Sequence, residues 1–371
     1  MTHPWISDRT TLFDSSGIRR VFDLASQLAD PINLSIGQPD FPVPAEVRQA
    51  CIEAIESGKN GYTLTQGIPE LRNKLQAKVD DEYKHHDRKL FVSSGTSGGL
   101  VLAMQALVNP GDEVIVFDPF FVMYAPLVQL VGGTPVFIDT YPDFRIDLNK
   151  VADAISPRTK LILLNSPANP TGIQLGEEEI RGVAELADER NVALVSDEIY
   201  REFCYDAPFI SPASFNERTI VIDGFSKSHA VTGWRLGFVH GPAEVVDAMV
   251  KLQQYTFVCA PQPAQWAAVT AMDVDIAAHI DAYRRKRDLL FEGLSGLYEI
   301  VRPAGAFYAF PKTPWGSGDE FVTKAIENNL LIIPGNIFSG RDTHFRLSYA
   351  ASDAVIERGI DVLRKIARQR P

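Results

Sequence analysis

The most reactive candidate in this sequence is Lys227, which lies in the stretch DGFSKSHAVTGWRLGF, residues 223–238. A lysine that is buried or lies near other cations holds its proton less tightly, and its neutral amine can form a Schiff base. Arg235 follows eight positions later and stays charged, so its guanidinium can bind a phosphate. Two simpler explanations are a surface lysine and an arginine whose head lies in solvent. This stretch alone leaves both open.

A second stretch, SSGTSGGL at residues 93–100, is a candidate phosphate site. It follows an apolar run and opens a helical pattern, so that backbone N–H groups at the helix start would face an anion. Its glycine spacing matches neither the dinucleotide-binding pattern nor the Walker A pattern. A phosphate is therefore plausible and a nucleotide is not indicated, while a plain tight turn explains the stretch equally well.

Two more stretches offer a carboxylate, a phenol and an amide. Asp197 in SDEIYREF ends an apolar run, where a charge is costly unless it is paired, and it could hold a cationic ring nitrogen. Tyr200 lies three residues later. Asn169 in NSPANPTG precedes a proline, which favours an extended backbone and could direct its amide into a cleft. Taken singly, Asp197 could cap the next segment and Asn169 could serve only the turn.

Alternating apolar runs and helical patterns predict where these groups lie. Continuous apolar strands between helices indicate a mostly parallel sheet that is buried on both faces. In such sheets ligands bind beyond the carboxyl ends of the strands, and the glycine-rich turn, Asn169, Asp197, Tyr200 and Lys227 all follow a strand. Their convergence argues against an ordinary structural role for each one. The apolar runs are residues 89–93, 112–118, 134–139, 160–165, 192–198, 219–225 and 235–240.

The chain of 371 residues is long enough for two domains. We predict an α/β fold in three parts. Residues 1–44 form an N-terminal arm and linker that partly joins the small domain. Residues 45–272 form a large, doubly wound domain with a mostly parallel sheet. Residues 273–371, where the pattern changes, form a smaller α+β domain.

These stretches resemble the pyridoxal-phosphate-dependent aminotransferases of fold type I, class I/II. GFSKSHAVTGWRLG (224–237) fits the lysine-attachment pattern of this family at every restricted position. The resemblance implies the cofactor pyridoxal 5′-phosphate, whose sites use a Schiff-base lysine and an acid at the pyridine nitrogen. Further matches cover nearly the whole chain: NLSIGQPDF (33–41), YTLTQGIPELR (62–72), SSGTSGGL, NPTG, SDEIY, GAFYAF (305–310) and FRLSYA (345–350).

The resemblance implies a role around the cofactor ring for several residues. Lys227 would be the Schiff-base lysine and the proton shuttle. Asp197 would keep the pyridine nitrogen protonated, while Tyr200 and Asn169 would hydrogen-bond the ring oxygen O3′. Phe121 would stack on the ring, although a core aromatic residue explains Phe121 as well.

The resemblance also implies how the phosphate is bound. Tyr62 resembles a tyrosine that reaches the phosphate from the neighbouring subunit, so we expect a homodimer. Position 224 is Gly where many relatives have Ser, and one hydroxyl contact would therefore be absent. The groups expected on the phosphate from the same subunit are Gly95, Thr96, Ser97, Ser226 and Arg235.

For the substrate, Arg346 in THFRLSYA resembles the clamp of the α-carboxylate, although a surface ion pair is the alternative. Gly37 resembles a glycine of the N-terminal segment that covers the substrate, and Asn169 also faces it. No motif clearly supplies a second arginine for a dicarboxylate; Arg19 and Arg20 are candidates. An apolar pocket would favour neutral or aromatic amino acids, and the residues that could form it are Phe121, Tyr255, Phe257 and Phe338.

Four functions are compatible with these residues. We favour an aminotransferase that exchanges an amino group between an L-amino acid and a 2-oxo acid by a ping-pong mechanism. A lyase of the same fold that catalyses β-elimination, or a synthase, would use the same cofactor residues. A non-catalytic binding module would not need the intact lysine, aspartate and arginine. A nucleotide-dependent oxidoreductase would leave Lys227 unexplained and requires a different glycine spacing.

Composition narrows the expected partners and location. With 36 Lys and Arg against 47 Asp and Glu, the net charge is −11, which disfavours nucleic acid and anionic membranes. The three cysteines include no CxxC pair, which fits a reducing cytoplasm. We expect no signal peptide, no membrane span and no metal, and we interpret His85 and His86 as part of a solvated charged face.

Overall fold

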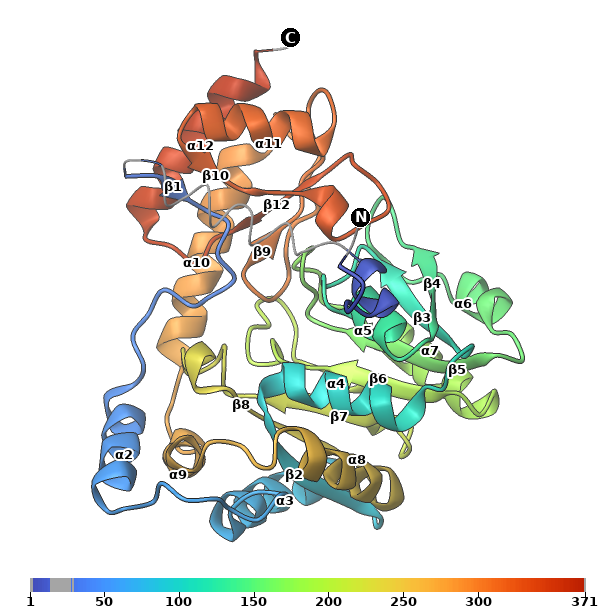
Figure 1. The fold of residues 1–371 in the computed structure, drawn as a ribbon. Helices are drawn as coiled ribbons and strands as arrows, with labels where there is room; N and C mark the ends of the chain where they lie inside the picture. The colour runs from blue at the N-terminus through green and yellow to red at the C-terminus, as the bar shows by residue number, and fades with distance from the viewer. Residues whose placement is uncertain (1–2, 14–27, 29, 370–371) are drawn as a thin grey trace.

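A seven-stranded sheet forms the centre of the structure (Figure 1). This computed structural model describes residues 3–13, 28 and 30–369. The strands are β2 (Arg88–Ser94), β3 (Glu113–Asp118), β4 (Thr134–Asp139), β5 (Thr159–Asn165), β6 (Ala193–Asp197), β7 (Ile220–Gly224) and β8 (Leu236–Pro242). Their order is β2-β8-β7-β6-β5-β3-β4, and only the pairings of β8 are antiparallel. The predicted α/β fold with a mostly parallel sheet is therefore confirmed.

The direction of β8 decides which loops meet. Since β8 alone runs the other way, its beginning lies at the sheet edge where all the other strands end. The register places Ser94 opposite Leu236 and Gly224 opposite Gly237. Arg235, immediately before β8, is therefore brought to the same edge as the loop that follows β7 and carries Lys227.

Alternating side chains of the strands build separate apolar clusters on the two faces of the sheet. In β5, Leu161 and Leu163 belong to one cluster, whereas Ile162 and Leu164 belong to the other. The first cluster includes α4 (Gly95–Leu107), α5 (Tyr124–Leu130) and α8 (Ala243–Thr256); the second includes α6 (Leu148–Ala154) and α7 (Glu177–Glu189). A third cluster joins β2 and β8 to α2 (Ala45–Glu56), α3 (Pro69–Tyr83) and α9 (Gln262–Ala271). None of the helices in the described part of the chain combines the length and apolar character needed to cross a membrane.

The C-terminal part contains α10 (Ala277–Leu294), α11 (Gly318–Glu327), α12 (Asp353–Ala367) and two small sheets. One sheet has the order β11 (Ile333–Pro334), β12 (Phe345–Ser348), β9 (Tyr308–Ala309); the other pairs β1 (Ile32–Asn33) with β10 (Leu330–Leu331). We propose the division at 44/45 and 272/273 for the folded chain. It is supported because the large sheet lies within 45–272, while β1 of the arm pairs with the C-terminal part.

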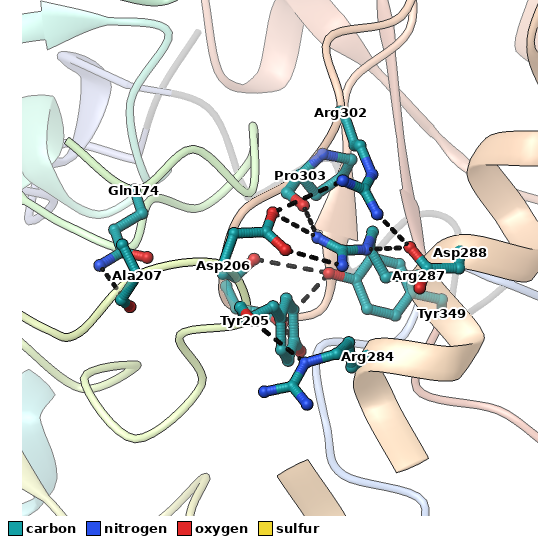
Figure 2. A network of polar contacts seen from close by, with 12 residues as sticks. Gln174, Tyr205, Asp206, Ala207, Arg284, Arg287, Asp288, Arg302, Pro303 and Tyr349 are labelled. Atoms are coloured by element: carbon teal, nitrogen blue, oxygen red, sulfur yellow. Dashed lines mark hydrogen bonds and ion pairs between the residues drawn. The ribbon is translucent and has the colours of Figure 1, made fainter. Parts of the chain in front are cut away.

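An ion pair between the buried guanidinium of Arg287 and the solvent-exposed Asp206 connects α10 to the loop that follows β6 (Figure 2). The guanidinium of Arg287 is 1% exposed and donates to both carboxylate oxygens of Asp206, at 2.9 and 3.1 Å. It also donates to the carbonyl oxygen of Pro303 at 2.7 Å. A buried guanidinium costs free energy without such partners, so loss of any of these contacts would destabilise the structure. The network holds the segment after Asp197 against the C-terminal part, which carries Arg346.

Candidate active site

A cleft of about 320 Å³ lies at the sheet edge where the strands end. Its lining comes from the strand ends, from the segment around Gly37, and from β9 and β12. It therefore lies between the large sheet and the C-terminal part. Most of the residues predicted from the sequence line it: Gly37, Thr96, Ser97, Phe121, Asn169, Asp197, Tyr200, Ser226, Lys227, Arg235 and Arg346.

The amine of Lys227 is directed at the N-terminal segment. Its Nζ donates a hydrogen bond to the backbone oxygen of Gly37 at 2.7 Å. Burial, and then the charges of Arg346 and Arg235, lower the pKa of Lys227 to about 8, whereas Asp197 opposes this shift. A substantial fraction of the amine is therefore neutral near physiological pH, as a nucleophile requires.

The carboxylate of Asp197 lies at the end of β6 and is held by two donors. The hydroxyl of Tyr124 donates to Oδ2 at 2.8 Å, and the backbone N–H of Ile199 donates to Oδ1 at 3.3 Å. Burial raises the pKa of Asp197 to about 6, which these hydrogen bonds and Lys227 counteract. The carboxyl is thus ionised at neutral pH and can pair with a cationic ring nitrogen.

The guanidinium of Arg346 is held at the side of the cleft formed by β12. It donates to Oδ1 of Asn169 at 3.0 Å and to the backbone oxygen of Ser35 at 2.7 Å. The rings of Tyr308 and Phe338 flank it, each with its centroid 4.7 Å from the guanidinium carbon. Its Nε is buried and has no hydrogen-bond partner within the described part of the chain. This orphan donor is suited to a carboxylate from a ligand.

Small residues bring the start of α4 close to Arg235. Gly95 has φ +69°, and a Cβ at this position would lie 2.5 Å from Nη2 of Arg235. The guanidinium also donates to the backbone oxygen of Thr232 at 2.9 Å. Thr96 and Ser97 begin the same helix, whose free N–H groups and positive dipole end favour an anion beside the guanidinium.

The structure supplies a packing reason for glycine at position 224. A Cβ on Gly224 would lie 2.8 Å from the Cα of Gly237 and 2.9 Å from the backbone oxygen of Leu236. The two glycines are paired between β7 and β8. A serine here would therefore collide with the neighbouring strand, so close packing of β7 against β8 requires glycine at position 224.

Two tyrosines of the cleft were not predicted from the sequence. Tyr124 follows Phe121 by three positions and orients Asp197, and the hydroxyl of Tyr308 lies 2.8 Å from the hydroxyl of Tyr200. Both contacts join residues far apart in the chain. The sequence signal for Tyr308 was its place in the GAFYAF match, which does not indicate which residue Tyr308 contacts.

Several candidates lie away from the cleft. Tyr62 is 87%, Tyr255 80% and Phe257 37% exposed, and the ring of Phe257 lies beside Gly98 of α4. Phe338 is fully buried behind Arg346 and does not line the cleft. None of these three residues lines the cleft of this chain, so the expectation that Tyr255, Phe257 and Phe338 make it apolar is wrong here. Arg19 and Arg20 lie outside the described residues.

Comparisons with known proteins point to one family. Residues 29–363 match the family model described as aminotransferase class I and II. A probable aspartate aminotransferase of Methanocaldococcus jannaschii is 38% identical over 97% of this chain and 99% of its own length. An aromatic-amino-acid aminotransferase of Thermococcus litoralis is 33% identical over 98% of this chain and 99% of its own. The structure of the aspartate aminotransferase of Thermus thermophilus with maleate superposes with a TM-score of 0.93, at 34% identity, covering 98% of this chain and all of that one.

The lowered pKa of Lys227 predicts how the cofactor-free protein reacts with pyridoxal phosphate. Only the neutral amine attacks an aldehyde, so the rate should rise with pH and reach half of its plateau near pH 8. The appearance of visible absorbance after rapid mixing measures this rate. Lys227→Ala should give no such absorbance. A rate that continues to rise above about pH 10, the ordinary range of lysine, would contradict the prediction.

The close approach of Gly95 to Arg235 predicts that Gly95→Ala weakens cofactor binding. The new Cβ would displace the guanidinium and strain a backbone with φ +69°, so the affinity should fall by roughly tenfold or more. Equilibrium titration of the cofactor-free protein with pyridoxal phosphate measures it. Gly233→Ala is the matched control, because no atom lies within 4 Å of its new Cβ. Equal cofactor affinities for the two variants would refute the prediction that the phosphate binds where Gly95 approaches Arg235.

Proposed function

Because this chain belongs to the class I and II aminotransferases, whose cofactor is pyridoxal 5′-phosphate, we propose that the cleft binds this cofactor and an amino acid through the residues predicted above. The protein is a transaminase; the relatives do not favour the alternative of a lyase. The observation that carries the assignment of residues is that Lys227, Asp197, Arg235 and Arg346 line one cleft.

The donor set of the cleft fits the chemical groups of the cofactor. Arg235 and the start of α4 suit a phosphate, because Gly95 leaves room beside the guanidinium. Asp197 suits a protonated pyridine nitrogen, and Lys227 suits a carbonyl carbon. Ser226 adds a hydroxyl beside them and lines the same cleft. When bound, pyridoxal phosphate supplies an aldehyde that condenses with amines and a ring that withdraws electrons from the α-carbon of the substrate.

The residues of this chain then bind, orient and move protons. Arg346 binds the α-carboxylate through its orphan Nε and thereby sets the direction of the bond to the α-hydrogen. The neutral amine of Lys227 accepts that proton from the α-carbon of the substrate. It then donates the proton to the carbon of the cofactor that carried the aldehyde. Asp197 keeps the ring nitrogen protonated, held in place by Tyr124.

Asn169 connects the two halves of the site in this proposal. Its Oδ1 accepts a hydrogen bond from Arg346 at 3.0 Å, which leaves its amide NH₂ free for the ring oxygen of the cofactor. Tyr200 would donate to the same oxygen. Phe121 lies on the cleft wall and would stack on the ring. Gly37 accepts from Lys227 and would cover the substrate from the N-terminal segment.

We further propose a homodimer in which Tyr62 reaches the phosphate of the neighbouring subunit. Tyr62, Leu64 and Tyr255 are 87%, 55% and 80% exposed, which is unusual for large apolar side chains on a free surface. They share one surface, because Gln253 on α8 donates to the backbone oxygen of Thr65 at 2.5 Å. A second copy of the chain would cover this surface.

The cationic residues that line the cleft limit which amino donor can bind. Among the described lining residues, the cations are Lys227, Arg235 and Arg346, and each already has a role in the proposal. A side-chain carboxylate would enter without a cation of its own, which costs free energy. We therefore propose a neutral or aromatic donor, with Phe121 and Tyr308 beside it.

A panel of amino donors with 2-oxoglutarate tests the function. We expect glutamate and the matching 2-oxo acid as products, and kcat/KM for phenylalanine or another neutral donor about tenfold or more above that for aspartate. Product quantification for each donor measures it. Pyruvate release from a β-substituted alanine as the fastest reaction would overturn transamination. An aspartate preference that Arg19→Ala or Arg20→Ala removes would overturn only the choice of donor.

Complementation between two defective chains tests the dimer. Tyr62→Ala should lower cofactor affinity, and Lys227→Ala should abolish activity. In a mixed dimer one site has an intact Lys227 and receives an intact Tyr62, so co-refolding the variants at limiting cofactor should restore activity several-fold above either alone. A mixture of Tyr62→Ala with the double variant Tyr62→Ala/Lys227→Ala is the matched control and should show no such recovery, because neither chain supplies an intact Tyr62. No recovery in the first mixture would show that Tyr62 serves its own subunit or none.

A further inference from the structure

Tyr308 contacts both the cofactor side and the substrate side of the cleft. Its hydroxyl lies 2.8 Å from the hydroxyl of Tyr200, and its ring lies 4.7 Å from the guanidinium carbon of Arg346. Tyr308 is 1% and Tyr200 4% exposed, and both line the cleft. Tyr308 therefore joins Tyr200 to Arg346 across the cleft.

The position of the Tyr308 hydroxyl is restrained from several directions. Its ring makes an edge-to-face contact with Tyr200, at 5.6 Å and 87°. Its backbone is paired with Ser348 in β12, two residues after Arg346. On the open side lies Gly37, where a Cβ would be 2.5 Å from the Tyr308 hydroxyl. The oxygen therefore has little freedom to leave Tyr200.

The protons of the two phenols decide the direction of their hydrogen bond. Each hydroxyl carries one proton, and burial raises the pKa of both residues, so that both are protonated at neutral pH. In the proposed function Tyr200 donates its proton to the ring oxygen of the cofactor. The oxygen of Tyr200 can then only accept in its contact with Tyr308, and Tyr308 must be the donor.

We propose that Tyr308 is a positioning residue that donates its hydroxyl proton to Tyr200 and so orients the Tyr200 hydroxyl toward the ring oxygen of the cofactor. This inference rests on the proposed function. A hydrogen-bond chain polarises each of its members, so the donation from Tyr308 strengthens the donation from Tyr200. A donor to the ring oxygen stabilises its anionic form, and the lysine-linked cofactor therefore loses its proton at a lower pH.

The test is a titration of the visible absorbance of the bound cofactor, without substrate, in Tyr308→Phe. Phenylalanine keeps the ring beside Arg346 and removes only the hydroxyl. We expect the midpoint of the absorbance change to rise by about 0.5–1 pH unit, the size of one hydrogen bond. Tyr200→Phe should also raise it, and the double variant Tyr200→Phe/Tyr308→Phe should show no larger rise than Tyr200→Phe alone.

Tyr205→Phe is the matched control, since Tyr205 is a buried tyrosine nearby whose hydroxyl donates to the backbone oxygen of Ala306 instead. It should leave the midpoint unchanged. An unchanged midpoint in Tyr308→Phe, or an equal rise with and without the Tyr200 hydroxyl, would overturn the inference. A wild-type protein that acquires no visible absorbance with pyridoxal phosphate would instead overturn the proposed function, so the two failures are distinguishable. Titrations at saturating cofactor keep this comparison valid for variants that bind it weakly.

Discussion

The side chains of Lys227, Arg235 and Arg346 place three cationic groups around one cleft, against the single carboxylate of Asp197 among its described lining residues. Buried charges of one sign raise each other's free energy. Burial first, and then the charges of Arg346 and Arg235, lower the pKa of Lys227 to about 8. A phosphate and a carboxylate would balance this excess. The charge pattern that is unfavourable in the free protein therefore matches an anionic cofactor with an amino acid.

Neutral groups hold these charges in place without changing their balance. The hydroxyl of Tyr124 orients Asp197, the amide of Asn169 orients Arg346, and the backbone oxygen of Gly37 orients Lys227. Aromatic faces on both sides of Arg346 restrict its guanidinium further. Such supports keep the reacting geometry rigid, which is what proximity and orientation require in catalysis.

The same cleft depends on contacts between parts of the chain that are distant in sequence. The large sheet supplies the strand ends, and β8 reverses direction so that Arg235 joins them. The C-terminal part supplies Arg346 and Tyr308. The ion pair of buried Arg287 with Asp206 connects these parts (Figure 2). Relative movement of the two parts would separate Arg346 from Lys227.

The sequence by itself predicted the α/β fold, the family, the cofactor and eleven of the residues that line the cleft, because strands, turns and the Lys227 stretch are local patterns. It did not predict Tyr124 on Asp197, Tyr308 on Tyr200 or the reversed β8, and it misplaced Phe338. The missed contacts join residues 73 and 108 positions apart. Only the tertiary structure decided them, because local periodicity does not specify which distant side chains meet. Those contacts form when the C-terminal part packs against the large sheet, with Arg287 buried between them.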